Sequence, residues 1–483
     1  MDCRKPLFCG CNHRRFLWKV AVFGIFSLPL HPLMQTFINR YMPHYRSLVA
    51  LGLPIVVGQL GTIVLGFADT IMVGRHSMAE LAAASFVNTL LMLFIVFALG
   101  FSYGLTPIVG QLFGSGDTGR IGTVVRNALA ANLMLAAMIV AVLMAVYANI
   151  DRLGQPEELL PLMRPYWLVC VASLPFVCVF NCFKQFYDGI GHTKVSMYVL
   201  IGGNVLNIVG NYLLIYGALG LPELGLLGAG IATLLSRVVM CLALVAAFFT
   251  MPRYRTHRRS FLSGRVNRAD FGRVNAISWP VALQMGMETA AFSLTAILVG
   301  WIGTTALAAH QVMLTLSQLF YMVYYGMAAA VSVRVSYFLG QRDLRSVNAT
   351  ANAGFHIILL VAVAVSVPIF LLRNHVSMLF TDSEDVCRLV GQAILVLIIY
   401  QFGDGLQCTF ANALRGLATV KPMIWIAFFS YFIVSLPLSW LLGIRLGLGL
   451  VGVWAAFPVC LTCAGVLYYF FFRRSLRLKG RAG

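Results

Sequence analysis

The chain has 483 residues, of which 60% are hydrophobic and 11% charged, and its mean hydropathy is +0.86. A soluble globular protein needs about 25% charged residues for its surface, so this composition excludes a set of soluble domains. The net charge of +19 does not indicate a nucleic-acid-binding face, because the basic residues lie between apolar blocks and at the two ends of the chain.

The first forty residues precede any segment long enough to cross a membrane. Residues 20–32 form an apolar run behind a basic segment, but the run is shorter than a bilayer requires. The nearby residues Cys3, Cys9, Cys11 and His13 lack a second ligand pair at zinc spacing. We therefore expect residues 1–44 to form an interfacial or disordered extension without a metal.

Twelve apolar blocks follow, each long enough for the roughly 20 residues that a bilayer demands. Lipid offers no partner to backbone N–H and C=O groups, so the spans must be helices, and their continuous apolar runs exclude a β-barrel. The predicted spans are 47–73, 80–110, 124–148, 161–183, 196–219, 226–251, 277–302, 306–338, 353–373, 387–411, 421–443 and 448–472.

The basic residues are distributed unevenly between the two sides of the membrane. If both termini and the 252–276 linker share one side, that side holds 28 of the 35 Lys and Arg residues: 7 before the first span, 7 in the linker, 5 in the tail and 9 in or beside short loops. The positive-inside rule then places both termini in the cytoplasm. We expect a multi-pass protein of the cell (inner) membrane.

The sequence contains an internal repeat. A shift of 226 to 227 residues aligns Pro54 with Pro280, Gly114 with Gly340 and Gly189 with Gly416. Because each repeat holds an even number of spans, the halves point the same way, an arrangement typical of some secondary transporters with a cavity between halves. The predicted organisation is the extension, a six-helix lobe over 45–251, a basic cytoplasmic linker over 252–276, a second six-helix lobe over 277–472 and a basic cytoplasmic tail over 473–483.

Three acids lie in the interior of the predicted spans: Asp69, Glu288 and Asp404. A carboxylate at this depth costs roughly 2.5–3.5 kcal/mol on the gentlest scale, so it normally faces a cavity, a cation or its own proton. Glu288 and Asp404 belong to the same half, where two carboxylates must share a proton or bind a cation. Hard oxygen ligands suit Na⁺ or H⁺, and Tyr400, one turn before Asp404, lies on the same face. The alternative for each acid is a buried residue paired with Arg or a carbonyl.

Other polar and aromatic residues in the spans are candidates for a substrate cavity, although helix packing and interhelical hydrogen bonds are the commoner uses of such residues. Arg237 and His310 also lie within spans and face the same choice. The cavity candidates are Gln59, Asn204, Asn207, Gln284, Phe292, Gln311 and Tyr325.

Several separated segments resemble the multidrug and toxic compound extrusion (MATE) transporters. They include GLPIVVGQLGTIVLGFADTIMVGR at 52–75 and YQFGDGLQCTFANALRG at 400–416, with further segments at 105–117, 303–312 and 331–341. The resemblance covers about residues 45–472 and is nearest to the bacterial NorM-like branch. It implies a V-shaped pair of six-helix lobes that export amphipathic, often cationic compounds in exchange for a cation.

The same resemblance implies roles for individual residues. Glu288 and Asp404, with Tyr400, match the residues that bind the coupling ion, and Asp69 matches an acid that acts in the first lobe. The sequence departs from the family at Asp188, where many members have Arg before Gly.

We therefore predict a monomeric multidrug antiporter, not an enzyme, that needs no cofactor besides its coupling ion, Na⁺ or H⁺. Its partners are the lipid bilayer and a small-molecule substrate that the sequence does not name. A flippase or exporter of a lipid-linked or other endogenous metabolite is the alternative. A membrane-embedded enzyme would need clustered metal ligands, which we do not find, and no G-x-x-x-x-G-K-[ST] motif indicates ATP use.

Overall fold

The computed structural model describes residues 32–373 and 375–482, and their side chains over 40–373 and 375–481. The chain divides between residues 43 and 44 into two units, and the description below concerns the second. The interpretation of residues 1–31, including Cys3, Cys9, Cys11 and His13, lies outside the described residues. The last part of the predicted extension is helical, because the first described helix begins at Pro32.

The described part of the chain consists of helices joined by short connections and has no strand. Twelve helices are long and apolar enough to cross a membrane, which confirms the predicted all-α fold with twelve spans. The helices of the first six spans are α2 (Pro32–His76), α3 (Met78–Ser102) continued by α4 (Leu105–Gly114), α5 (Thr118–Tyr147), α6 (Leu160–Gly189), α7 (Thr193–Ile215) and α8 (Gly225–Thr250).

The second six spans begin after a short helix of the linker, α9 (Arg255–Ser263). One span is irregular: between α14 (Lys421–Ala427) and Arg445 it contains π-helical turns on either side of α15 (Leu436–Trp440). The remaining spans are α10 (Arg268–Gly300), α11 (Thr304–Gly340), α12 (Leu344–Leu371), α13 (Glu384–Gly416) and α16 (Gly449–Ala482).

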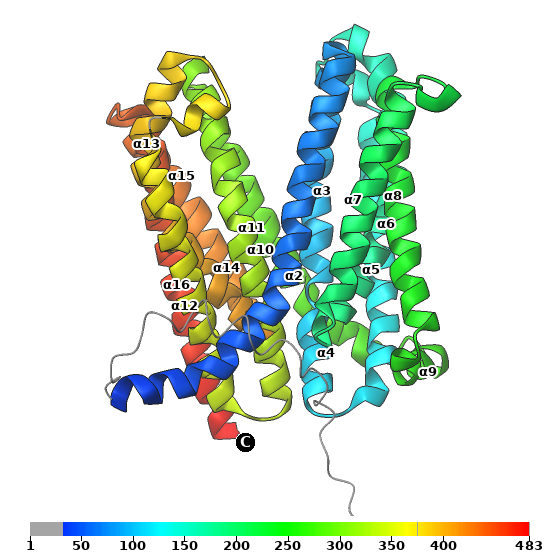
Figure 1. Cartoon of the computed structure of the whole chain (residues 1–483), viewed down its shortest axis with the longest axis vertical. Coiled ribbons are helices and arrows are strands. Elements are labelled where there is room, and N and C mark those ends of the chain that lie inside the picture. The colour runs from blue at the N-terminus through cyan, green and yellow to red at the C-terminus, as the bar shows by residue number, and fades with distance from the viewer. Residues whose placement is uncertain (1–31, 374, 483) are drawn as a thin grey trace, which may run out of the picture. The chain divides into compact units, whose positions relative to one another are not determined.

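The helices of each half pack mainly against one another. In the N-terminal half, α6 contacts α5 and α8, and α7 contacts α8; in the C-terminal half, α13 contacts α11, α12 and α16 (Figure 1). An apolar helix face is about equally stable against lipid and against protein. The polar and small residues therefore determine which faces turn toward the other helices.

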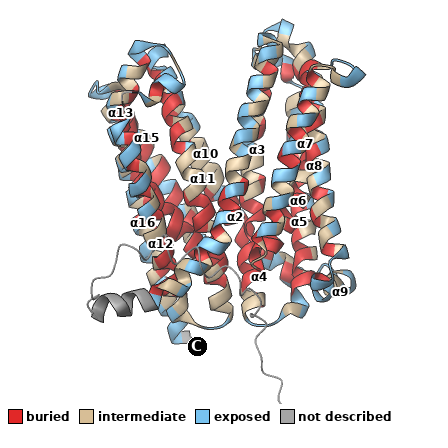
Figure 2. Cartoon of the chain, in the orientation of Figure 1, coloured by how far each residue is buried: buried red, intermediate tan, exposed pale blue. Residues whose placement is uncertain are grey.

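The two halves meet where α3 and α4 pack against α10 and α11. Glycines allow the backbones to touch there: a Cβ on Gly104 would lie 2.7 Å from the Cα of Ser278, and a Cβ on Gly114 would lie 2.0 Å from the carbonyl oxygen of Tyr337. These contacts fall at the helix ends nearest the 251–267 connection, which we call the linker side. Figure 2 shows buried residues gathered where α4 meets the C-terminal half.

The linker docks on the N-terminal half through α9 and α5. The backbone N–H of Gly122 donates to Ser260 Oγ at 3.1 Å, and Arg126 donates to the carbonyl oxygens of Phe261, Leu262 and Gly264. Because these carbonyls end α9, Arg126 satisfies groups that a helix terminus otherwise leaves unpaired.

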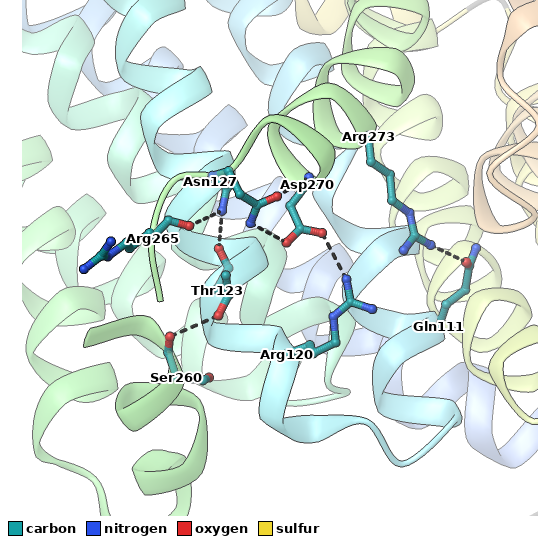
Figure 3. Close-up of polar contacts among 9 residues, drawn as sticks. Gln111, Arg120, Thr123, Asn127, Ser260, Arg265, Asp270 and Arg273 are labelled. Carbon is teal, nitrogen blue, oxygen red and sulfur yellow. Dashed lines mark hydrogen bonds and ion pairs between the residues drawn. The ribbon is translucent and has the colours of Figure 1, made fainter. Parts of the chain in front are cut away.

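The start of α10 is also held by the N-terminal half (Figure 3). Asn127 accepts from the backbone N–H of Asn267 at 2.9 Å, and Arg120 of α5 pairs with Asp270 at 3.3 Å. Arg273 donates to Gln111 of α4 at 3.1 Å. The linker side of α10 is thus bonded to the half of the molecule that precedes it in sequence.

Two histidines lie in or beside the docked linker, and from them we predict that the docking depends on pH. Burial lowers the pKa of His257 from its ordinary 6.5, and burial with the nearby charge of Arg253 lowers that of His192. Because the pKa of each imidazole is lower when the linker is docked, protonation below pH 6.5 favours the undocked state. Docking therefore weakens as the pH falls. Hydrogen exchange of residues 255–263, corrected for intrinsic rates, should therefore be faster at pH 5.5 than at pH 7.5. The change should shrink in His257→Gln, and protection that is equal at both pH values would contradict this prediction.

Candidate cation and substrate site

Glu288 lies on α10 among amide and hydroxyl groups of the C-terminal half. Gln284, one helical turn earlier, donates to Glu288 Oε2 at 2.9 Å, and Gln407 of α13 donates to Oε1 at 3.4 Å. The Gln407 amide also donates to the hydroxyl of Tyr431 at 2.7 Å. Glu288 forms no ion pair with Lys or Arg among the described residues.

Asp404 is buried at the centre of α13, with only 2% of its surface exposed. Its Oδ2 atom is buried without a hydrogen-bond partner. Tyr400, one turn before it, packs against the rings of Trp454 at 5.9 Å and Phe457 at 6.2 Å. A carboxylate in such an apolar setting is stable only with a proton or a cation beside it, because burial penalises the bare charge.

The polar groups around these two acids are rich in unused oxygen acceptors. Glu288 and Asp404 interact electrostatically, and Gln284 Oε1 and Gln407 Oε1, like Asp404 Oδ2, are buried without a donor. Such a set of oxygen atoms fits a hard monovalent cation such as Na⁺. Among the described residues no group of three or more His, Cys, Asp or Glu side chains is placed to hold a metal ion, so the donor set does not resemble that of a zinc site.

Asp69 lies in the N-terminal half and has amide partners of its own. Its Oδ1 atom accepts from Asn211 at 2.5 Å, and the same Asn211 amide donates to Asn207 at 3.1 Å. Asn207 in turn donates to Thr233 of α8 at 3.1 Å. The amides thus join α2, α7 and α8, and Asn207, a predicted cavity residue, takes part in the interhelical hydrogen bonding that is the commoner use of such residues.

Asn211 offers a test of how much this network stabilises the N-terminal half. Asn211→Leu should lower the free energy of unfolding by about 1–3 kcal/mol, because it leaves the Asp69 oxygen and Asn207 without their donor. The double variant Asp69→Leu/Asn211→Leu should regain part of that loss, since it removes both partners. Thermal unfolding in detergent measures both. A loss of stability in the double variant that equals or exceeds the sum of the two single losses would contradict the pairing.

The remaining predicted cavity residues are divided between the two halves. Gln284 and Tyr325 line a small pocket next to Glu288, and Phe292 stacks on Phe457 at 4.8 Å. Asn204 is buried, with its amide nitrogen unpaired, whereas Gln59 is partly exposed and Gln311 exposed. The Asp69 group and the Glu288–Asp404 group share no hydrogen bond.

Arg237 and His310 are used in hydrogen bonds. Arg237 donates to Ser173 Oγ at 2.6 Å and interacts electrostatically with Asp69. His310, fully buried, accepts from the indole N–H of Trp454 at 3.0 Å.

Three charged residues at the linker side lie in helices beyond the predicted spans, and of these the sequence analysis named only Asp188, as a departure from the family. Lys184 pairs with Asp188 one turn later at 2.8 Å, and Arg415 is buried with 4% of its surface exposed. The predicted spans ended at 183 and 411, whereas α6 and α13 continue to Gly189 and Gly416. The repeat contained the missing signal, because the shift that aligns the two glycines also aligns Asp188 with Arg415.

Comparison with known proteins gives consistent results. The MatE family model matches residues 54–213 and 280–441. The chain is 31% identical over 435 residues to the multidrug resistance protein NorM of Vibrio cholerae, covering 89% of this chain and 95% of that protein. It is 29% identical over 428 residues to a probable multidrug resistance protein NorM of Photorhabdus laumondii, covering 88% and 94%. The crystal structure of a Vibrio cholerae MATE transporter, VcmN, matches with a TM-score of 0.80 at 18% identity, covering 91% of this chain and 98% of that one.

Proposed function

Because this chain belongs to the MatE family of membrane transporters and is therefore a transporter and not an enzyme, we propose that it exports amphipathic drugs or toxic compounds in exchange for an inward-moving cation. Two of its relatives are named as a multidrug resistance protein or a probable one, which supports the export of drugs. The observation that carries the exchange mechanism is that two acids within the spans, Glu288 and Asp404, form no ion pair with Lys or Arg among the described residues.

In this proposal Glu288 and Asp404 bind the coupling cation, and the surrounding amide oxygens complete its shell. The unpaired oxygen atoms of Gln284 and Gln407 favour Na⁺ over a bare proton, since a proton on one carboxyl group would leave these acceptors unused. Tyr400 lies one helical turn before Asp404 and packs against the ring of Trp454. It therefore forms the boundary between the cation site and the apolar side chains around Trp454. Asp69, with Asn207, serves the N-terminal half, which carries substrate in the same cycle.

The uneven charge distribution supports an orientation in the cell membrane with both termini in the cytoplasm. The linker side is then the cytoplasmic side, and the glycine contacts of Gly104 and Gly114 close it. The protein then opens the opposite side to release substrate, closes it, and opens the linker side again. This sequence is alternating access around the cation site. The protein works as a monomer in this scheme, because one chain contains both the cation site and the surface between the halves.

Dye efflux from inverted membrane vesicles tests the proposal. A sodium gradient and a pH gradient are imposed separately, and accumulation of a cationic fluorescent dye is followed in each. We expect the sodium gradient to drive transport at constant pH, whereas transport driven by the pH gradient alone would assign the proton instead. Transport that requires neither gradient would refute cation exchange.

A further inference from the structure

Two small pockets adjoin one another near the linker side and share Tyr325, Asn412 and Arg415. One also reaches Lys184, Gln185 and Asp188 of the N-terminal half, and the other reaches Glu288 of the C-terminal half. Arg415 therefore lies between an acid of each half. The second pocket is also lined by Gln284 and Gln407, which contact Glu288 in the proposed cation site, so Arg415 borders that site.

The guanidinium of Arg415 is buried without a carboxylate in contact. It donates to Asn412 Oδ1 at 3.2 Å and lies over the ring of Tyr103 at 5.2 Å, and its Nε is buried without a partner. No acid among the described residues forms an ion pair with it, although Glu288 attracts it electrostatically. A buried cation with no bound counter-charge is costly, so its environment is suited to a change of partner.

Asp188 offers one half of such a change. It is buried, its Oδ2 is held by Lys184 at 2.8 Å, and its Oδ1 has no hydrogen-bond partner. Both Asp188 and Arg415 line the same pocket, where Gln185 Nε2 and Ser332 Oγ are also buried and unpaired. Asp188 thus has an oxygen atom without a hydrogen bond in the same pocket as Arg415, which has no ion pair among the described residues.

We propose that Arg415 is a built-in competitor for the coupling cation, an inference that rests on the proposed function. While the linker side is closed, Arg415 is attracted both by Asp188, which lines the same pocket from across the boundary, and by Glu288 in its own half, so its hold on Glu288 is weakened and the cation can bind there. When the halves part on the linker side, Asp188 leaves with the N-terminal half and keeps Lys184 as its partner. Arg415 then turns to Glu288, which lies in its own half, and displaces the cation toward the linker side.

This exchange of partners makes cation binding and closure of the linker side interdependent. If the closed state binds the cation more tightly than the open state, then adding the cation must raise the closed population by the same factor. A gap in affinity between the two states is useful to an antiporter, because the ion binds on one side and must be released on the other. Arg415 acts here through Glu288 and is a positioning residue.

The test is a distance measurement on the full-length protein in lipid nanodiscs. Spin labels on noncanonical amino acids at Ser115 and Gln341, exposed residues at the linker-side ends of the two halves, report closure by pulsed electron resonance. Na⁺ is titrated at constant pH, and a parallel titration by tryptophan fluorescence reports binding, since Trp454 lies beside Tyr400. Arg334→Gln is the matched control, because Arg334 stacks on Tyr337 and Phe338 and lines neither pocket.

In the wild type and in Arg334→Gln, saturating Na⁺ should raise the ratio of closed to open molecules at least about tenfold, as expected for one unit charge exchanged at short range. Arg415→Gln should bind Na⁺ yet show no Na⁺-dependent change in that ratio. Arg415→Lys should retain part of the response. Asp188→Asn should bind Na⁺ more weakly and should show no Na⁺-dependent change in the ratio of closed to open molecules.

A full response in Arg415→Gln would overturn the inference and leave the cation site intact. If Arg415→Gln fails to fold, Asp188→Asn becomes the test of the inference. A wild-type response in Asp188→Asn would overturn the inference in the same way. A wild type that binds neither Na⁺ nor, in a pH titration of the same fluorescence, a proton would overturn the proposed function itself.

Discussion

Glu288→Gln and Asp404→Asn should each abolish cation-driven export while leaving the protein folded and inserted. Both substitutions keep the shape of the side chain and remove the charge that the coupling cation needs. Without that charge the imposed sodium gradient has no group to act on, so the variants should lose the gradient-driven accumulation of the cationic dye entirely. Dye accumulation in inverted vesicles measures this loss.

The control for this experiment is an acid of the same charge outside the spans. Asp382 is exposed in the connection before α13, so Asp382→Asn should accumulate dye at the wild-type level. Size-exclusion profiles of the purified variants separate lost coupling from lost folding. Wild-type accumulation by the Glu288→Gln/Asp404→Asn double variant would show that the coupling charge lies elsewhere.

Gly114→Ala should hinder closure of the linker side and reduce export several-fold or more. The added Cβ would lie 2.0 Å from the carbonyl oxygen of Tyr337, a backbone atom that no rotamer change can move away. Overpacking of this kind typically costs 1–3 kcal/mol, which shifts a balanced closure equilibrium by about fivefold at the low end and by more than a hundredfold at the high end. The distance between labels at Ser115 and Gln341 should lengthen in the variant.

The matched control is the same substitution at a glycine with free space. A Cβ on Gly119, at the start of α5, meets no atom within 4 Å, so Gly119→Ala should keep the wild-type distance and export rate. Equal effects at both positions would mean that the glycine contact between α4 and α11 does not control closure.

The twelve spans could be predicted because lipid accepts only continuous apolar helices, so hydropathy alone locates them. The helix ends could not be located in the same way. Lys184, Asp188 and Arg415 are polar and were assigned to loops, yet they lie in helices whose ends are buried between other helices. Hydropathy measures the preference for lipid and is insensitive to polar residues that face protein.

The irregular span also lay beyond sequence analysis. The π-helical turns at Phe428–Ser435 and Leu441–Arg445 occur in an apolar stretch whose composition resembles that of the regular spans. Such turns depend on packing with neighbouring helices, which the hydrophobic pattern of one segment does not encode. The docking of α9 on α5 depends on single contacts such as that of Gly122, and these also leave no periodic signal.

The acids of the proposed site were found because a charge at membrane depth is costly and therefore rare. Their partners were not foreseen: Gln407 and Tyr431, which contact Glu288 or its neighbours, have no property in sequence that separates them from other polar residues in spans. Gln284 was predicted as a cavity residue, and the structure places it in contact with Glu288.

The binding of Na⁺ to the purified protein, measured by isothermal titration calorimetry at constant pH, tests the central claim most directly. The account predicts one saturable site in the wild type that disappears in the Glu288→Gln/Asp404→Asn double variant and persists in Asp382→Asn. Undiminished Na⁺ binding by the double variant would contradict the assignment of the coupling cation to these two carboxyl groups.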